Sequence, residues 1–417
     1  MKRSQLAWMT VAGLWLVVVV LFGSAIPPRG LYIEPVSQVF HTTRAGASLL
    51  SSAASVGMCL GSLVAGWLLG WVDARWAILL GATIEGLSFV LASQATTFSL
   101  LVGANGLIGA GVGIGALIPV SFIVGNWFKK GSGVAMAVAM TGTSLGGSAM
   151  VMAVNFFISR WGWRAGYGLL ALPIALVVAP TVALLRSLPP AQSSLPAVER
   201  PAALEVSGLD LGKALETREF WIIALGQFLY GCVAGGVLSR LPPYLAGIGY
   251  GATSTAAVVS VVLGLNSVGK IALGFAADRI GSARVLAFSF LAEAIGVALL
   301  LGAGRTVFLV PAVFCYGLSW GTPLALLPLL TIDSLGLRHY GAISGLTNIA
   351  FFAGNAMGPW AAGRTFDASG SYTGAFVGMV LALVVTSLTV LACRRLELTP
   401  AHASSRSEAV LAESARR

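Results

Sequence analysis

Charged residues are scarce in this chain. Only 10% of its 417 residues are Asp, Glu, Lys or Arg, whereas 57% are hydrophobic and the mean hydropathy is +0.89. A water-soluble domain of this length carries a larger polar and charged surface. The composition therefore excludes an ordinary soluble domain and indicates an integral membrane protein.

Cysteine and histidine are also few, with four and three copies. The cysteines stand singly in apolar stretches, and the histidines lie at predicted helix ends or in the C-terminal tail. Neither a disulfide framework nor a metal-ligand spacing is present. The glycine run 106–115 lies inside a predicted helix and follows no strand, which argues against a dinucleotide-binding loop. We expect no metal, no cofactor and no enzymatic activity.

Long apolar stretches, by contrast, are abundant. Inside a bilayer the backbone polar groups must be satisfied within the spanning segment, which favours helices. The sequence predicts an all-α membrane protein with twelve transmembrane helices, at about residues 8–38, 45–69, 76–94, 99–126, 131–158, 163–185, 221–246, 255–277, 283–303, 308–331, 341–362 and 373–393.

The 25 lysines and arginines are unevenly distributed between these stretches. With the N-terminus in the cytoplasm, 17 fall on the cytoplasmic side, five outside and three within predicted helices. This positive-inside bias predicts that both termini are cytoplasmic. It also explains the net charge of +10 without a nucleic-acid partner. We expect a multi-pass protein of the plasma membrane, which in a bacterium is the inner membrane.

The two halves of the chain match at a constant offset of 208 residues. Glycine is unfavourable inside helices unless close packing requires it, so repeated glycines at one offset indicate duplication. We therefore predict two pseudo-symmetric six-helix bundles, an N-terminal half at 1–186 and a C-terminal half at 220–396, joined by a polar linker at 187–219 and followed by a cytoplasmic tail at 397–417. The matching pairs are Pro35 and Pro243, Gly66 and Gly274, Glu85 and Glu293, Gly109 and Gly317, Gly113 and Gly321, Gly133 and Gly341, and Gly146 and Gly354.

Lys270 places an ammonium group inside the apolar stretch 256–277. A charge at this depth costs about 3 kcal/mol on insertion scales and is usually kept for function. The offset maps Lys270 onto Ser62, so only the C-terminal half carries this cation. Asn266 lies one helical turn before Lys270 and faces the same way. We expect an acidic partner or an anionic substrate near Lys270.

A charged motif follows the second predicted helix of each half. The motifs are Gly274-Phe-Ala-Ala-Asp278-Arg279-Ile-Gly281-Ser-Ala-Arg284 and a weaker copy, Gly66-Trp-Leu-Leu-Gly70-Trp-Val-Asp73-Ala-Arg75. In these motifs and in its predicted helices the chain resembles the major facilitator superfamily. The resemblance implies conformational latches on the cytoplasmic face, formed by Asp278, Arg279, Arg284, Asp73 and Arg75.

Shorter strings give a finer resemblance. They are Asn126-Trp-Phe128, Phe220-Trp221, Arg240-Leu-Pro-Pro-Tyr-Leu245, Asp333-Ser-Leu-Gly-Leu-Arg-His-Tyr-Gly341, Gly358-Pro359 and Phe366-Asp-Ala-Ser-Gly-Ser-Tyr372. In this order they resemble the monocarboxylate transporters and oxalate–formate antiporters. The resemblance implies a carboxylate-binding cation at Lys270 and a second cation at Arg29. The acid of that family that takes part in proton coupling falls on Asn266, so proton symport and exchange both stay open.

Five further side chains are candidates for a substrate site. Tyr316 and Trp320 share one face of a predicted helix, and Asn348 and Phe352 share one face of another. Aromatic groups around a carboxylate would exclude water and shape the pocket for the organic part of the ligand. Arg240 lies near the outer end of its helix, where it could contact substrate. Ordinary core packing explains the aromatic and amide pairs equally well, and an interfacial anchor explains Arg240.

Glu85 and Glu293 form a symmetric pair of acids inside two predicted helices. Carboxylates inside a bilayer pair with cations or carry protons. We favour pairing with cations of the cytoplasmic loops over proton transport.

These residues together predict a secondary active transporter of small organic anions, foremost monocarboxylates, that works by alternating access with Lys270 binding the carboxylate. An oxalate–formate-like dicarboxylate exchanger is the alternative, because two cations would engage both ends of a dicarboxylate. Drug or metabolite efflux is a further alternative, which would favour an acidic site. We expect a small carboxylate as substrate and protons as a candidate coupling ion. We also expect the protein to be a monomer in the lipid bilayer.

Overall fold

The structure is a computed structural model that describes residues 3–42, 44–47, 49–128, 131–184 and 208–393. Most of the predicted linker, residues 187–207, and the predicted tail at 397–417 lie outside the described residues. Within them the chain is helical and has no strand, only one isolated bridge between Gly208 and Gly336. The all-α prediction is confirmed.

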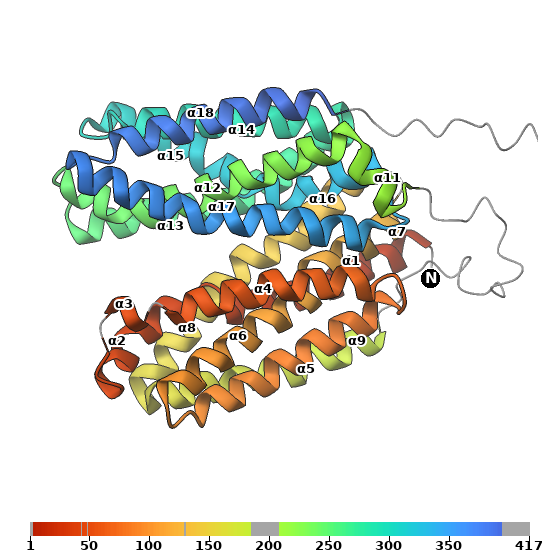
Figure 1. Cartoon of the computed structure of the whole chain (residues 1–417), viewed down its shortest axis with the longest axis horizontal. Coiled ribbons are helices and arrows are strands. Elements are labelled where there is room, and N and C mark those ends of the chain that lie inside the picture. The colour runs from red at the N-terminus through yellow and green to blue at the C-terminus, as the bar shows by residue number, and fades with distance from the viewer. Residues whose placement is uncertain (1–2, 43, 48, 129–130, 185–207, 394–417) are drawn as a thin grey trace, which may run out of the picture.

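The N-terminal half forms the helices drawn in red to yellow in Figure 1. They are α1 (Arg3–Ala25), α2 (Arg29–Val39), α3 (Arg44–Ala47), α4 (Leu49–Leu68), α5 (Ala74–Ser93), α6 (Phe98–Gly115), α7 (Leu117–Trp127), α8 (Ser132–Pro173), a π-helical turn (Ile174–Val178) and α9 (Ala179–Leu184).

The C-terminal half follows in green to blue. Its helices are α11 (Leu211–Glu216), α12 (Arg218–Gly247), α13 (Ala252–Ile280), α14 (Ser282–Leu300), α15 (Thr306–Trp320), α16 (Thr322–Leu335), α17 (Tyr340–Ser369) and α18 (Thr373–Leu391).

Several predicted spans are interrupted where the sequence disfavours a continuous helix. Pro27 and Pro28 separate α1 from α2, because proline removes a helix hydrogen bond. Gly321 separates α15 from α16. Gly162 turns the chain inside α8 with a φ of 81°, a left-handed conformation that glycine adopts readily.

Length and apolarity mark ten candidate membrane spans in the described chain. The predicted number of twelve differs from this for two reasons. Residues 132–183 count as one continuous run, although the turn at Gly162 divides them. Helix α17 is long enough, but it is not among the ten apolar stretches. The twelve-helix count therefore stays a prediction.

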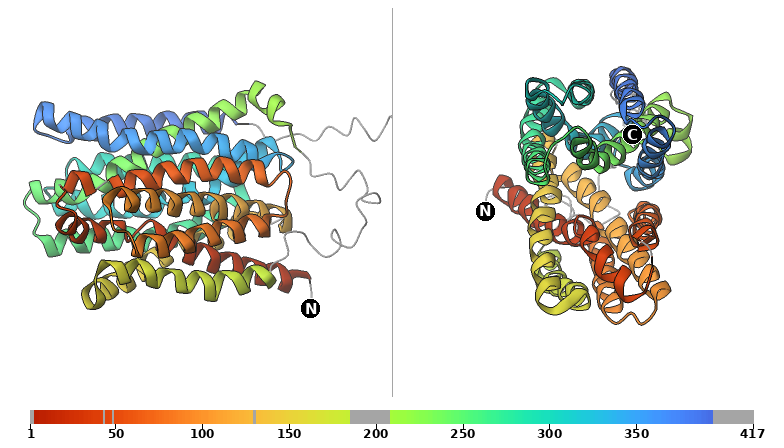
Figure 2. Two further views of the ribbon diagram at one scale, coloured as in Figure 1. Left: turned by 60° about the horizontal axis from the view of Figure 1, so that its bottom comes forward. Right: turned by 90° about the vertical axis from the view of Figure 1, so that its left-hand side faces the viewer.

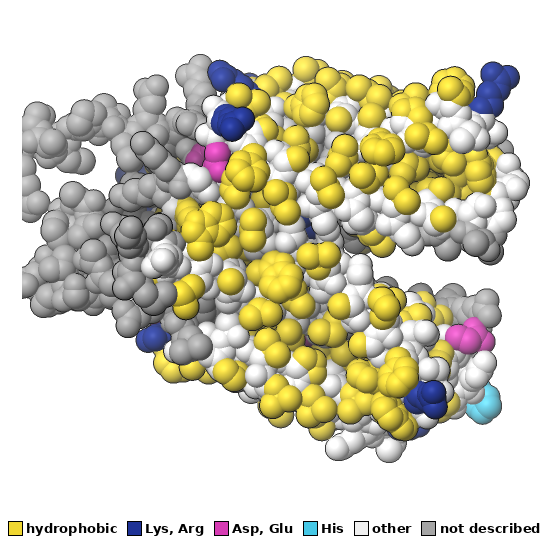
Figure 3. All heavy atoms as spheres, turned by 180° about the vertical axis from the view of Figure 1, so that it is seen from behind, with side chains coloured by type: hydrophobic (Ala, Val, Ile, Leu, Met, Phe, Trp, Pro, Cys, Tyr) yellow, Lys and Arg dark blue, Asp and Glu magenta, His cyan; other side chains and the backbone are white. Residues whose placement is uncertain are grey.

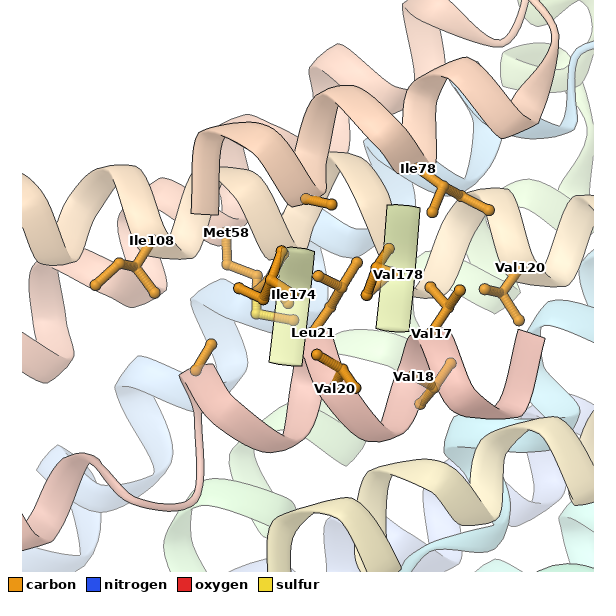
Figure 4. Close-up of a cluster of buried hydrophobic side chains, with 14 of the residues drawn as sticks. Val17, Val18, Val20, Leu21, Met58, Ile78, Ile108, Val120, Ile174 and Val178 are labelled. Carbon is orange, nitrogen blue, oxygen red and sulfur yellow. The ribbon is translucent and has the colours of Figure 1, made fainter. Parts of the chain in front are cut away.

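The molecule consists of two helical bundles that lie side by side (Figures 1 and 2). One apolar core is built almost wholly from residues 7–182, and a second from residues 214–390. Figure 4 shows part of the first core, where Leu21 of α1 lies beside Ile174 and Val178. Each half therefore buries its own apolar side chains, as a duplicated fold requires.

The two ends of the bundles can be told apart by the elements that lie there. We call one end the linker face; it lies at the right of Figure 1, and the N-terminus and the start of α12 lie there. The other end is the opposite face, where α2, α3 and the turn between α12 and α13 lie. Between these ends, large hydrophobic side chains cover the surface seen in Figure 3. This apolar belt fits helices that face lipid.

The halves meet closely at two glycine crossings. Gly66 of α4 packs on Gly341 of α17, and a Cβ atom at Gly66 would collide with the Gly341 carbonyl. Gly274 of α13 packs on Gly133 of α8, where a Cβ at Gly133 would lie 2.6 Å from the Gly274 carbonyl oxygen. The offset of 208 residues relates the two crossings, since it maps Gly66 onto Gly274 and Gly133 onto Gly341.

The described end of the predicted linker packs on the C-terminal half. The Leu209 amide donates to the Leu335 carbonyl at 2.9 Å. The Asp210 carboxylate lies 3.5 Å from the Arg338 guanidinium and 3.0 Å from His339 Nε2. These contacts hold α11 against the turn between α16 and α17.

Candidate functional site

A cavity of about 720 Å3 lies between the two halves. Both halves contribute to its walls, through helices that include α1, α4 and α8 on one side and α12, α13 and α17 on the other. Figure 3 shows that the halves part at the opposite face and meet toward the linker face. The cavity is therefore open at one end of the molecule.

Lys270 lines this cavity from α13 and is only 1% exposed. Its ammonium donates to three oxygens of α8 in the other half: the Thr143 hydroxyl at 2.7 Å, the Ser144 hydroxyl at 2.9 Å and the Met140 carbonyl at 3.3 Å. All three partners are neutral. Among the described residues Lys270 has no acidic partner, so its charge is solvated but not neutralised.

Asn266 lies beside Lys270 in the cavity wall, as the one-turn spacing predicts. Its side chain is 2% exposed, and its Oδ1 atom has no hydrogen-bond partner among the described residues. Gly321 provides the space for this amide, because a Cβ at Gly321 would overlap Asn266 Oδ1. The break between α15 and α16 therefore touches the cavity at Asn266.

Arg29 lines the same cavity from the N-terminal half. It is the first residue of α2, and its Nε donates to the Ala25 carbonyl at 2.6 Å across the proline break. Its Nη2 atom is buried and has no hydrogen-bond partner among the described residues. An unpaired, buried guanidinium nitrogen is costly unless an anion binds it.

The aromatic and amide candidates divide into two groups. Trp320, Asn348 and Phe352 line the cavity. Tyr316 lies behind Trp320, fully buried in the core of the C-terminal half, with the two rings stacked at 6.3 Å. The structure therefore places three of the four at the cavity surface.

Arg240 lies elsewhere. Its Nη2 donates to the Pro359 carbonyl of α17 at 3.1 Å, and Arg240 is not among the residues that line the cavity. The contact joins α12 to α17 within the C-terminal half. In this conformation the position fits the anchoring interpretation better than substrate contact.

Of the five predicted latch residues, Asp278 contacts the other half. Its two carboxylate oxygens accept hydrogen bonds from the backbone amides of Gly133 at 2.7 Å and Val134 at 3.0 Å, in the first turn of α8. A carboxylate at a helix N-terminus satisfies free amides and complements the helix dipole. Asp278 thus fastens the crossing of α13 and α8.

Asp73, Arg75 and Arg284 make contacts within their own half. Asp73 caps α5 by accepting from the Arg75 amide at 3.1 Å, and its carboxylate lies 3.6 Å from the Arg75 guanidinium. Arg284 donates to the Ile280 carbonyl at 3.5 Å. Arg279 is exposed at the end of α13. The residue that the offset relates to Asp278 is Gly70, which has no side chain to cap α17.

The two symmetric acids are fully buried within the bundles. Glu85 Oε1 accepts a hydrogen bond from the Ser24 hydroxyl at 2.8 Å. Both carboxylate oxygens of Glu293 lack a partner among the described residues. Neither acid forms a salt bridge with a cation of the described residues, so the predicted pairing with loop cations is not found there.

The sequence interpretation overlooked the α8 side chains that hold Lys270. Thr143 and Ser144 both line the cavity, next to Gly147 and Ser148. A signal existed, since these hydroxyl and small residues interrupt an apolar stretch in the middle of a predicted span. Polar residues at that depth usually face other helices rather than lipid.

Residues 7–359 match the family described as the Major Facilitator Superfamily. The chain belongs to this family. It is therefore an integral, multi-pass membrane protein of a family of transporters. Its helices, duplicated bundles and central cavity are the fold of that superfamily.

Similar proteins support the finer resemblance. Monocarboxylate transporter 12-B of Danio rerio is 26% identical over 91% of this chain and 85% of its own length. Monocarboxylate transporter 13 of Bos taurus is 26% identical over 89% of this chain and 85% of its own. The superfamily transporter FucP, solved in the outward conformation, has the same fold at a TM-score of 0.71, with 20% identity, covering 94% of this chain and 98% of its own.

Proposed function

We propose that this protein is a secondary active transporter of small organic anions, foremost monocarboxylates, and not an enzyme. The observation that carries the proposal is the charge of the cavity. The described residues that line it include two cations, Arg29 and Lys270, and no Asp or Glu. A cleft with charge of one sign attracts ligands of the opposite sign. The names of the monocarboxylate transporter relatives agree with an anionic substrate.

Lys270 is the proposed carboxylate ligand. Its present partners, the Thr143 and Ser144 hydroxyls, are neutral, whereas a carboxylate would form charge-assisted hydrogen bonds that are stronger. A substrate carboxylate would therefore displace a hydroxyl from the ammonium. That displacement would loosen the tie between α13 and α8, and so couple binding to movement of the halves.

Arg29 is the proposed second contact. Its free Nη2 atom offers a donor that this conformation leaves unused. The residue sits directly after the Pro27-Pro28 break, where the chain lacks helix hydrogen bonds and can bend at low cost. We propose that Arg29 closes over a bound anion from the N-terminal half while Lys270 holds it from the C-terminal half.

Most of the remaining lining is apolar and suits the organic part of a substrate. Trp320 and Phe352 present rings to the cavity, and Asn266 and Asn348 add amides that fix orientation. Small-molecule sites usually combine an apolar wall with a few placed polar groups. This arrangement favours a carboxylate with a hydrocarbon or aromatic body.

The direction of opening follows from charge. If the linker face is cytoplasmic, as the positive-inside rule predicts, the cavity faces the outside and Asp278 closes the cytoplasmic end. The protein would then have both termini inside and lie in the plasma membrane. Four residues stay predicted latch residues that would act in other conformations: Arg279, Arg284, Asp73 and Arg75. Arg240 likewise stays a predicted substrate contact in another conformation.

A dicarboxylate exchanger is the second candidate. The placement of the two cations on different halves favours it, because one carboxylate at Arg29 and one at Lys270 would bridge the halves. Uptake driven only by carboxylate loaded inside proteoliposomes, with no response to a pH gradient, would favour exchange over symport.

The test uses reconstituted protein and labelled carboxylates of both classes. Lys270→Ala should abolish uptake while the protein still folds, and Lys213→Ala should retain it. Lys213 is a suitable control because it is an exposed lysine on α11, outside the cavity. Unchanged uptake in Lys270→Ala would contradict the assignment of Lys270 as the carboxylate ligand.

A further inference from the structure

We propose that Glu293 binds a proton inside the C-terminal bundle and couples proton movement to transport, an inference that rests on the transport function proposed above. The ligand class is the proton itself. The site differs from the anion site because Glu293 does not line the cavity.

Burial of Glu293 without a partner is the first observation. The side chain of Glu293 is 0% exposed, and neither Oε1 nor Oε2 has a hydrogen-bond partner among the described residues. No lysine or arginine of the described chain lies within salt-bridge distance of it. An ionised carboxylate in such surroundings is far more costly than a neutral acid. Burial without a partner therefore favours the neutral, protonated acid at Glu293 in this conformation.

Comparison with the symmetric acid sharpens this point. Glu85 occupies the equivalent position in the N-terminal half and accepts a hydrogen bond from Ser24. The offset of 208 maps Ser24 onto Cys232, whose thiol is a weaker donor than a hydroxyl. The duplication thus retains both acids but leaves only the C-terminal one without a hydrogen-bond donor.

The groups that face Glu293 are tyrosines rather than cations. Tyr316 of α15 and Tyr230 of α12 both lie within electrostatic reach of it. The Tyr230 ring also packs on Phe290, one turn before Glu293, at 5.9 Å.

The other helices packed on α14 bring no charge to Glu293. Helix α18 has no charged residue. The only acid of α16, Asp333, accepts a hydrogen bond from Ser282 at the linker face. On α13, Lys270 and Asp278 bond to α8, and Arg279 is exposed. The remaining ionisable group of α15, Cys315, is only partly buried.

A short route joins Glu293 to the cavity. Tyr230 and Trp320 both line the cavity, and the Tyr230 hydroxyl donates to the Trp320 carbonyl at 2.8 Å. Tyr316 stacks behind Trp320. The aromatic side chains of Tyr230, Trp320 and Tyr316 therefore offer a path between the cavity and the buried acid.

The same layer holds the groups that could stabilise the ionised form. The Tyr316 hydroxyl and the Trp320 indole nitrogen are both buried without a hydrogen-bond partner among the described residues. Both lie on α15, which packs against α14. If α15 turns so that either donates to Glu293, the O–H bond of the acid breaks, the electron pair stays on the carboxylate, and the proton passes to water in the cavity.

Gly321 links this change to the substrate. It ends α15 directly after Trp320 and touches Asn266 in the cavity wall. A carboxylate bound at Lys270 and Asn266 would shift the Asn266 amide against Gly321, and this shift would move the neighbouring Trp320. Asn266, Gly321, Trp320 and Tyr316 thereby connect the anion site to the proton site.

The test compares Glu293→Gln with Glu85→Gln in proteoliposomes. An imposed pH gradient should accelerate carboxylate uptake by the wild type, and the ratio of uptake with and without the gradient should fall to one in Glu293→Gln. Exchange against carboxylate loaded inside should persist in Glu293→Gln, because glutamine resembles the neutral acid. Glu85→Gln should keep the gradient response. A full gradient response in Glu293→Gln, or none in the wild type, would overturn the inference.

A second measurement separates this inference from the proposed substrate. Infrared spectra of the purified protein near neutral pH should show a protonated carboxylic acid band in the wild type that is absent from the double variant Glu85→Gln/Glu293→Gln and retained in Glu85→Gln alone. If no carboxylate is transported but the band is present and specific to Glu293, the transport proposal fails while the proton site stands. Absence of the band from Glu85→Gln shows that Glu293 is ionised and refutes the proton site.

Discussion

The Lys270 ammonium donates to the Thr143 hydroxyl at 2.7 Å, and this bond joins the C-terminal half to the N-terminal half in the middle of the protein. A charged group thus forms the contact, yet no opposite charge compensates it. Under the proposed function, a substrate carboxylate replaces this neutral acceptor because its bond to the ammonium is charge-assisted on both sides.

Removing the Thr143 hydroxyl should lower the stability of the protein without substrate and increase the stabilisation that a carboxylate ligand gives. Thr143→Val leaves one ammonium proton without its acceptor, which costs about 1–3 kcal/mol. We expect a lower melting temperature, and a larger rise on adding carboxylate than in the wild type, since the ligand supplies the missing acceptor. Thr386→Val is the matched control, because Thr386 is a buried threonine whose hydroxyl donates to the Ala382 carbonyl of its own helix. Equal ligand responses in both variants would contradict the role of Lys270.

Asp278→Asn should favour opening at the linker face. Asparagine has one acceptor oxygen where the carboxylate uses two, so one α8 amide loses its partner and the helix dipole loses a complementary charge. A cost of about 1 kcal/mol shifts a two-state population about fivefold. Distances between spin labels on α8 and α13 at the linker face should show a larger separated population. Asp73→Asn serves as control, because that carboxylate caps α5 within its own half. The expectation fails if both variants give the wild-type distribution.

Gly274→Ala should block transport without unfolding the protein. The added Cβ would lie 2.6 Å from Ala137 Cβ and 2.8 Å from the Gly133 carbonyl oxygen, so the two halves could not approach at this crossing. Gly378→Ala in α18 has no atom within 4 Å of the new Cβ and should be silent. Both variants should keep their helical content by circular dichroism. Normal uptake by Gly274→Ala would show that this crossing need not close.

Asn266→Asp should reduce affinity for the anion. A carboxylate one turn from Lys270 would pair with the ammonium and repel the substrate. We expect KM to rise about tenfold, equivalent to about 1.4 kcal/mol, and uptake to recover as the pH falls and the new acid becomes neutral. Measuring KM across pH separates this electrostatic effect from misfolding. A pH-independent KM in the variant would show that position 266 does not sense the substrate charge.

The sequence predicted the architecture well because lipid imposes simple rules. Apolar length located the helices, and repeated glycines located the positions where helices pack closely. The same glycines, Gly66, Gly133, Gly274 and Gly341, form the crossings between halves. Helix breaks at Ala116 and Gly321 were not predicted, because apolar length does not register a local change in backbone direction.

The site could be predicted only in part. Lys270 and Asn266 stood out because polar groups are costly in an apolar span, and both line the cavity. The partners of Lys270 lie 126 to 130 residues away in the other half, which helical periodicity cannot reveal. Arg240 and Tyr316 are residue types that binding sites often use, but tertiary packing places both outside the cavity.

The two glycine crossings are related by duplication but unequal in strength. Asp278 joins α13 to α8 at one crossing, whereas the equivalent position at the crossing of α4 and α17 is Gly70, which has no carboxylate. When the halves move apart at this end, the crossing without the Asp278 hydrogen bonds separates at lower cost. If the linker face is cytoplasmic, α4 and α17 would therefore separate before α13 and α8, and substrate would leave past α4 and α17.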